Sequence, residues 1–330
     1  MNFRGVPAVV LLVSIAFLPG RSAFAGQSGS TPAELLRNCE GCNLAGQNFA
    51  GLDLHGLSID AANLAGANFR GANLSGTAFE GANLRNADFR DADLRGARFE
   101  GASIAGARFD GARLDGAQFE GVDLRETAAL QSKSQLRKML ERCEGCNMEG
   151  LDLSGMNLRT VRFEGTNLEN VNFRNADLSD AHFDGANLRG ATLRGARVIS
   201  VNFEGANLEG IDFSGMDLSD AGLEGSRLSS ANLAGANLSH ASVVGANFRS
   251  AGLRSADLSN AVVCTDSLSD GNRLGGKIVC ARFDNADLRG ANLRHARHCT
   301  WRNNVTNCRQ ITADELRSAA HANLAGATAP

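Results

Sequence analysis

The chain has 330 residues, of which 43% are hydrophobic and 21% are charged. This composition suffices to build a packed core and excludes a chain that is disordered by composition. Lysine and arginine number 33 and aspartate and glutamate 36, a balance that gives no electrostatic reason to expect nucleic acid or an anionic membrane as a partner.

The N-terminal residues have the pattern of an export signal. Arg4 provides a positive start, residues 6–18 are almost entirely apolar, and Ala23-Phe24-Ala25 forms a small-residue exit. An apolar run of about 13 residues is too short to span a bilayer. We expect cleavage after Ala25 and an exported mature chain without a membrane span, periplasmic or secreted, with 31 basic and 36 acidic side chains. In that compartment disulfides persist.

Two short helices are predicted, each followed by the sequence Cys-Glu-Gly-Cys. A capping box at residues 31–34, with proline at the first helical position, predicts a helix that ends near Asn38, before the first such motif. Ser132 or Ser134 caps a second helix that runs through Arg142, before the second motif. This duplication indicates two modules of one design.

A repeat of five residues fills most of the chain. An apolar residue recurs at every fifth position from Leu44 to Leu124 and again from Met148 to Val263, and residues 283–293 add three more repeats. Neither the strand period of two nor the helical period of 3.6 survives a repeat of five. Each repeat must therefore be a short straight piece followed by a bend, with the apolar centre and the small residue two places before it facing a core.

Phenylalanine fixes the expected size of a coil. All 14 phenylalanines beyond the predicted cleavage site lie at repeat centres, and in the first array they occupy every second centre. A four-sided coil of 20 residues would stack Phe69 beneath Phe89 and Phe109, with a second phenylalanine column on the opposite wall. Such a coil cannot bury its own core, so stacked neighbours must do so.

Residues 62–66 and 92–96 read Ala-Asn-Leu-Ala-Gly and Ala-Asp-Leu-Arg-Gly. Both match the motif A-(D/N)-L-X-X of the pentapeptide-repeat family, which the chain resembles over about two-thirds of its length. The resemblance implies an all-β solenoid, a right-handed quadrilateral β-helix. It implies little about function, because the family is functionally mixed.

We therefore predict an all-β solenoid with two arrays of repeats and short capping helices. The repeat changes phase between the arrays, so residues 127–145 are expected to cap the open edges of both, and the relative orientation of the arrays stays open. A capping box predicts a closing helix from Ala313 to about Ala322. The expected segments are a signal peptide (1–25), a capping helix with its cysteine motif (26–42), the first β-helix (43–126), a capping or linker helix (127–146), the second β-helix (147–295) with an irregular coil at 264–280, and a C-terminal cap with a loose tail (296–330).

The sequence contains no motif of an enzyme. Nucleophile elbow, phosphate loop and metalloprotease helix are all lacking, so we expect no catalytic activity and no cofactor.

The sharpest surface feature is a column of acids at 20-residue spacing. Carboxylates about 5 Å apart repel one another, and a divalent cation would relieve that repulsion. A solvated stripe, relieved by Arg162, is the simpler interpretation, and a similar acidic column next to Arg98 in the first array favours it. We therefore predict no metal site. The candidate column comprises Glu164, Asp184, Glu204 and Glu224, with His182 beside it.

The eight cysteines, an even number in an exported chain, predict four disulfides. The two Cys-Glu-Gly-Cys motifs are expected to close locally, as Cys39–Cys42 and Cys143–Cys146. In an ideal coil Cys280 lies under residue 300, within bridging distance of Cys299. That geometry favours the pairs Cys280–Cys299 and Cys264–Cys308. The alternative, nearly as strong because both segments are irregular, is Cys264–Cys280 with Cys299–Cys308.

Regularity without a convergent pocket favours a non-enzymatic extracytoplasmic scaffold that presents flat walls to a protein partner. One alternative comes from the resemblance, because family members that mimic B-DNA protect DNA gyrase. The export signal and a mature net charge of only −5 disfavour it. Another alternative is a cation- or glycan-binding envelope protein, which depends on the acidic column.

Overall fold

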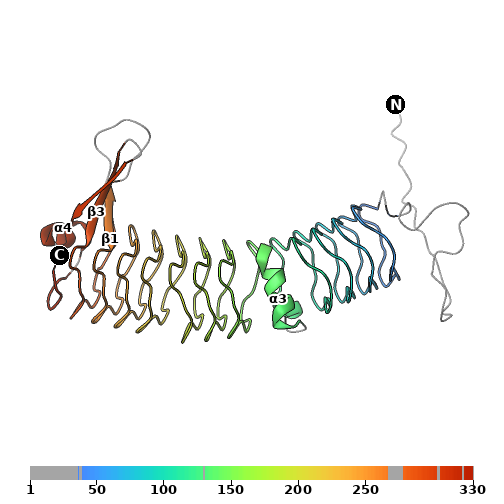
Figure 1. Ribbon diagram of the computed structural model, residues 1–330, viewed down its shortest axis with the longest axis horizontal. Coiled ribbons are helices and arrows are strands. Elements are labelled where there is room, and N and C mark those ends of the chain that lie inside the picture. Colours follow the sequence, from blue (N-terminus) through green and yellow to red (C-terminus); the bar gives the residue numbers. More distant parts are fainter. Residues whose placement is uncertain are drawn as a thin grey trace, which may run out of the picture.

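The computed structural model describes residues 36, 39–128, 131–266, 278–302, 305–321 and 323–329. These residues form a long rod of stacked coils, with a short sheet that stands out from the C-terminal end (Figure 1). The predicted signal peptide and nearly all of the first predicted helix lie outside the described residues. Among the described residues, no helix is long and apolar enough to cross a membrane.

Each coil consists of four five-residue sides. Parallel β-bridges join residues 20 positions apart on each side, as between Asn43 and Asn63 or between Asn48 and Asn68. The fifth residue of a repeat turns the corner with positive φ, which costs glycine nothing; Gly46 has a φ of 68°. The chain is therefore a β-helical solenoid, and its coil has the predicted length.

The core consists of alanines and repeat centres, stacked coil upon coil. Phe69 stacks on Phe49 and on Phe89, with ring centroids 5.0 Å apart in both pairs. Phe79 and Phe99 stack in the same way on the opposite wall, at 5.2 Å. The two columns meet edge to face, at 5.9 Å between Phe69 and Phe79. Every one of these rings is fully buried, as the spacing of phenylalanine predicted.

The two arrays form one continuous rod (Figure 1). Asp123, in the last coil of the first array, bridges to Asn147, in the first coil of the second. On an adjacent side, Phe119 N donates to Arg142 O at 2.8 Å. The expectation that residues 127–145 cap the open edges of both arrays is therefore wrong for two of the four sides, where the β-ladder passes through them.

Helices α2 (Arg125–Ala128) and α3 (Lys133–Met139), followed by the 3₁₀-helix η1 (Leu140–Arg142), fill the other two sides. Ser132 caps α3 by accepting from Gln135 N, as the sequence allowed. The coil at this point spans 24 residues instead of 20, between Asp123 and Asn147. We call residues 125–146 the splice.

Side chains of the splice take over hydrogen bonds that the backbone makes elsewhere. Gln131 accepts from Phe109 N at 3.2 Å and donates to Ala107 O at 3.1 Å, so its amide replaces a peptide group of the absent strand. Gln135 donates to Ala112 O at 3.0 Å. These bonds satisfy three backbone groups at the open edge of the first array.

On the other side of α3, cationic side chains donate hydrogen bonds to backbone carbonyls of the second array. Arg137 Nε donates to Asn157 O at 2.9 Å, and its Nη2 donates to Arg159 O at 3.3 Å. Lys133 donates to Ser154 O. Helix α3 therefore satisfies polar backbone groups of the coils on both sides, which otherwise would stay unpaired.

Beyond residue 261 the chain leaves the rod twice. Strands β1 (Val262–Asp266) and β2 (Ile278–Cys280) form one antiparallel pair, and β3 (Arg297–Arg302) and β4 (Val305–Gln310) form another. Strands β1 and β3 run parallel, which gives a sheet with the order β2-β1-β3-β4. This sheet, which we call the arm, projects from the side of the rod (Figure 1).

The arm corrects two of the predicted disulfides. The pairs Cys280–Cys299 and Cys264–Cys308 are wrong: the structure joins Cys264 to Cys280 and Cys299 to Cys308. Each pair lies directly opposite across two antiparallel strands, with Cα atoms 4.0 Å apart. The ideal-coil geometry failed because β1 and β2 pair antiparallel, whereas successive coils pair in parallel. The local disulfides are Cys39–Cys42 and Cys143–Cys146.

Helix α4 (Ala313–Ala319) closes the C-terminal end and is three residues shorter than expected. Thr312 and Glu315 form the predicted capping box. The tail after it is not loose, which corrects the sequence analysis. Gly290 N donates to Gly326 O at 2.6 Å, and Leu293 N donates to Thr328 O at 3.0 Å. The single repeat in the tail stays in place because the last coil offers it an unpaired edge.

Candidate docking wall

Ten acidic side chains form one column along a single wall, one in each of ten successive coils. The backbone amide that follows each acid donates to the carbonyl of the next acid in the column, at 2.7–3.2 Å, as from Gly41 to Asp60. At about 4.8 Å per coil the column is roughly 43 Å long. We call it the acidic stripe: Glu40, Asp60, Glu80, Glu100, Glu120, Glu144, Glu164, Asp184, Glu204 and Glu224.

Few cations balance this stripe. The neighbouring column of the same wall carries Arg98, Arg142, Arg162 and His182. Arg98 Nε lies 2.7 Å from Glu80 Oε1, and Arg162 lies 2.8 Å from Glu164 and 3.4 Å from Glu144. Ten acids thus face three arginines, although the formal charge of the whole chain is only −3. The negative charge of the protein is therefore concentrated on this wall, and the rest of the chain is net positive.

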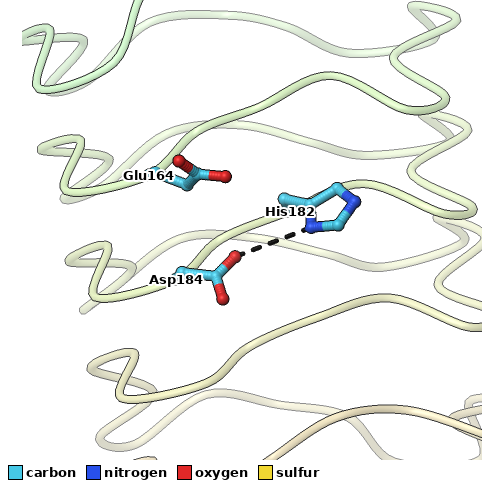
Figure 2. Close-up of side chains that lie close together, drawn as sticks. All are labelled: Glu164, His182 and Asp184. Carbon is cyan, nitrogen blue, oxygen red and sulfur yellow. Dashed lines mark ion pairs between the residues drawn. The ribbon is translucent and has the colours of Figure 1, made fainter.

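Three members of the predicted acidic column come close together. Glu164, His182 and Asp184 each offer a ligand atom within 4.8 Å of the others, from two successive coils (Figure 2). His182 Nδ1 lies 3.7 Å from Asp184 Oδ2, and Asp184 Oδ1 accepts from Asn202 at 2.7 Å. Glu204 and Glu224 continue the stripe in the next two coils but do not belong to this group.

Arg162 sets the charge of this cluster. Its hydrogen bonds lower the pKa of the Glu164 carboxyl, although burial acts in the opposite direction. Glu164 is therefore a carboxylate that already has a cationic partner. Asp184 Oδ2 is buried and accepts no hydrogen bond, so the cluster retains one acceptor for a cationic group. Chemically, the wall can attract cations along its length, and nothing in the cluster resembles a nucleophile with its base.

Sequence reasoning found the stripe only in pieces. The change of phase between the arrays separated Glu80, Glu100 and Glu120 from the column that begins at Glu164. The missing link is Glu144, in the second Cys-Glu-Gly-Cys motif, because Gly121 N donates to Glu144 O and Gly145 N to Glu164 O, both at 2.9 Å. The signal was present, since each motif places its glutamate one residue after a buried cysteine that acts as a repeat centre.

Known families and structures match this architecture. The family described as pentapeptide repeats matches in eight copies, over residues 38–76, 62–101, 92–127, 199–233, 231–263 and 276–297. A second description, pentapeptide repeat region, matches residues 138–213 and so begins within the splice. No curated protein matches the chain by sequence.

Solved structures share the repeat at low identity. QnrB1, a plasmid-mediated fluoroquinolone resistance protein, is 21% identical over 56% of this chain and 84% of its own, with a TM-score of 0.28. HetL, involved in heterocyst differentiation regulation in the cyanobacterium Nostoc, is 23% identical over 80% of this chain and 98% of its own, with a TM-score of 0.20. A protein from the thylakoid lumen of Arabidopsis thaliana is 26% identical over 42% of this chain and 75% of its own, with a TM-score of 0.17. Repeat, coil and family matches agree: the chain belongs to the pentapeptide repeat family.

Proposed function

We propose that the protein is an exported, non-enzymatic scaffold, a right-handed quadrilateral β-helix that binds a protein partner on the wall of the acidic stripe. The observation that carries this proposal is the continuity of the stripe through the splice. Fixed charges on a rigid rod steer a partner of opposite charge and set its register. The partner should therefore present basic side chains along an extended surface.

Charge geometry favours a protein over the DNA mimicry known from relatives. A mimic of duplex DNA must display two phosphate-like rows of charge, whereas this chain concentrates its net negative charge in one column. The predicted export signal also argues against contact with gyrase. An assay of gyrase supercoiling should show no inhibition, and inhibition at micromolar concentration would favour mimicry.

The direct test uses immobilised mature protein and an extracytoplasmic extract. A variant with Glu80, Glu100 and Glu120 changed to glutamine should lose a specific captured protein that the wild type retains. Its matched control changes Glu149, Glu169 and Glu209 to glutamine, which removes the same charge from a different wall. The control should retain the protein.

The outcome separates the wall from nonspecific charge. Loss of the captured protein in both variants would show that net charge alone attracts it. Capture by neither the wild type nor the control would contradict the scaffold proposal. Fractionation with N-terminal sequencing of the mature chain tests export independently, and a start at Gly26 is expected.

Cation binding is the second candidate, because the ligand atoms of Glu164, His182 and Asp184 all lie within 4.8 Å of one another. Arg162 already occupies Glu164, so calorimetric titration with calcium should give no heat for the wild type. Heat that disappears in Asp184→Asn would favour a cation-binding protein instead.

A further inference from the structure

A hollow of about 610 Å³ opens at the end of the rod that carries α4, and none of its lining residues belongs to the acidic stripe. Three segments that are distant in sequence form it, one of them the tail that pairs with the last coil. Its polar lining consists of Arg249, Arg282, Asp284, Asn285, His321 and Asn323.

Stacking of the final coils brings these segments together. Ser250 N donates to Asp284 O, and Phe283 N donates to Ala320 O, both at 2.9 Å, so residues 249–250, 282–286 and 320–321 lie in successive layers. Asn285 and His321 occupy the corner position with φ of 56° and 54°. Glycine is the common residue there, so these two corners add polar side chains where the rod elsewhere is often bare.

The fixed charges of the hollow are positive in sum. Arg282 Nε donates to Asp284 Oδ2 at 3.1 Å, which leaves its terminal nitrogens available. Burial acts to raise the pKa of Asp284, but the hydrogen bond and charge of Arg282 lower it, so Asp284 is ionised. Among the described residues, the Arg249 guanidinium has no ion pair or hydrogen-bond partner. The hollow therefore contains two guanidinium groups and one carboxylate, which pairs with Arg282, on a chain whose net charge is negative.

The remaining groups define the chemistry of a ligand. Asn323 Oδ1 accepts from Ala325 N at 3.1 Å, so its amide nitrogen is the group left to donate. Asn285 adds a second amide, and Ala286 is the only apolar residue in the lining. Arginine binds carboxylates and phosphates through paired donors, and amides bind hydroxyls. The size falls within the range of about 300–1,000 Å³ that is typical of small-molecule sites.

We propose that this hollow binds a small hydrophilic carboxylate, a sugar acid such as a uronic acid. Arg249 and Arg282 hold the carboxylate, and Asn285 and Asn323 bind hydroxyl groups. The site does not depend on the proposed scaffold function.

Calorimetry on the mature chain tests the proposal with three probes: galacturonate, its neutral counterpart galactose, and inorganic phosphate. Galacturonate should bind and galactose should not. Arg249→Ala and Arg282→Ala should each weaken binding about tenfold, as expected for one lost charge-assisted hydrogen bond. The control Arg189→Ala, three coils away on the same wall, should bind like the wild type.

A gain-of-affinity variant guards against effects of misfolding. Asp284→Asn removes the carboxylate that competes for Arg282, so galacturonate should bind more tightly. Phosphate that competes with galacturonate would support the oxyanion site. Equal binding of galactose, galacturonate binding that is indifferent to both arginine variants, or binding of phosphate without galacturonate would overturn the proposal.

Discussion

The splice and the arm are two interruptions of the same coil, and the chain resolves them in opposite ways. The splice adds four residues to one coil and stays within the rod, where Gln131, Gln135 and Arg137 replace missing backbone bonds. The first excursion of the arm makes the bridge from Asn247 reach Arg282, 35 residues on instead of 20, and the extra strands leave the rod.

The two interruptions should therefore differ in how strongly their unfolding is coupled to that of the rod. The splice packs Leu136, Met139 and Leu140 into the core that both arrays share. The arm is continuous with the coils at the bases of β1 and β3, where Val262 bridges to Ser242 and Arg297 N donates to Ala261 O, and disulfides close each of its antiparallel strand pairs. We therefore expect damage to the splice to unfold the rod and damage to the arm to remain local.

The largest effect should come from Leu140→Ala. This side chain is fully buried in the splice, and its truncation should reduce the free energy of unfolding by about 4 kcal/mol. Urea denaturation followed by circular dichroism measures the change. Leu324→Ala in the tail is the control and should leave the main transition in place. A loss below about 1 kcal/mol for Leu140→Ala would show that the splice is not part of the shared core.

Removing the disulfide of the first arm hairpin should have a large but local effect. Cys264→Ser combined with Cys280→Ser opens a loop of 16 residues. The chain entropy that such a disulfide removes from the unfolded state corresponds to about 3 kcal/mol of stability. Hydrogen exchange should accelerate in β1 and β2, while the urea midpoint of the rod stays unchanged. An equal shift of the rod midpoint would mean that arm and rod unfold as one unit.

Gln131→Ala tests the substitution of a side-chain amide for a peptide group. Three hydrogen bonds are lost, to Phe109 N, Ala107 O and Thr127 O, and Phe109 N and Ala107 O are left unpaired, so we expect a loss of about 2 kcal/mol. Gln118→Ala, on an outer wall of a regular coil, should change stability by less than about 0.5 kcal/mol. Identical values for the two variants would contradict the role assigned to Gln131.

The smallest effect concerns pH and α4. The hydrogen bonds of Arg309 and Thr312 lower the pKa of Glu315 to about 2. Because the pKa is lower in the folded state than in the unfolded state, this contribution is complete above the ordinary pKa of a glutamate. It is lost as the pH falls from there towards 2. Circular dichroism as a function of pH can follow the transition.

Glu315→Gln removes the titrating group and supplies the comparison. This variant should lose about 1 kcal/mol at neutral pH, the usual value of a helix cap. It should also show a weaker acid transition than the wild type. An unchanged acid transition would show that other carboxylates cause it.

Periodic features were predictable from the sequence, and features that depend on a break in the period were not. Phe69 and Phe89 revealed the coil because each repeat carries the same local information. The pairing of Cys264 with Cys280 depends on how two irregular strands meet, which a 20-residue coil cannot describe. The replacement of a backbone peptide group by the side-chain amide of Gln131 produces no recognisable pattern in the sequence. For the same reason, the stripe appeared as two columns until the bridge from Asp123 to Asn147 joined them.

The central claim is that the two arrays form one rigid rod with one continuous acidic wall. The most direct test is a distance measurement by pulsed electron paramagnetic resonance. Spin labels are placed at positions 75 and 219 by chemistry that does not react with the cysteines. Both positions follow the same wall on opposite sides of the splice, seven coils apart. A single narrow distribution centred at about 34 Å between the backbone positions is expected from the coil spacing. A broad distribution, or a centre displaced by about 10 Å or more, would show two rods joined by a hinge.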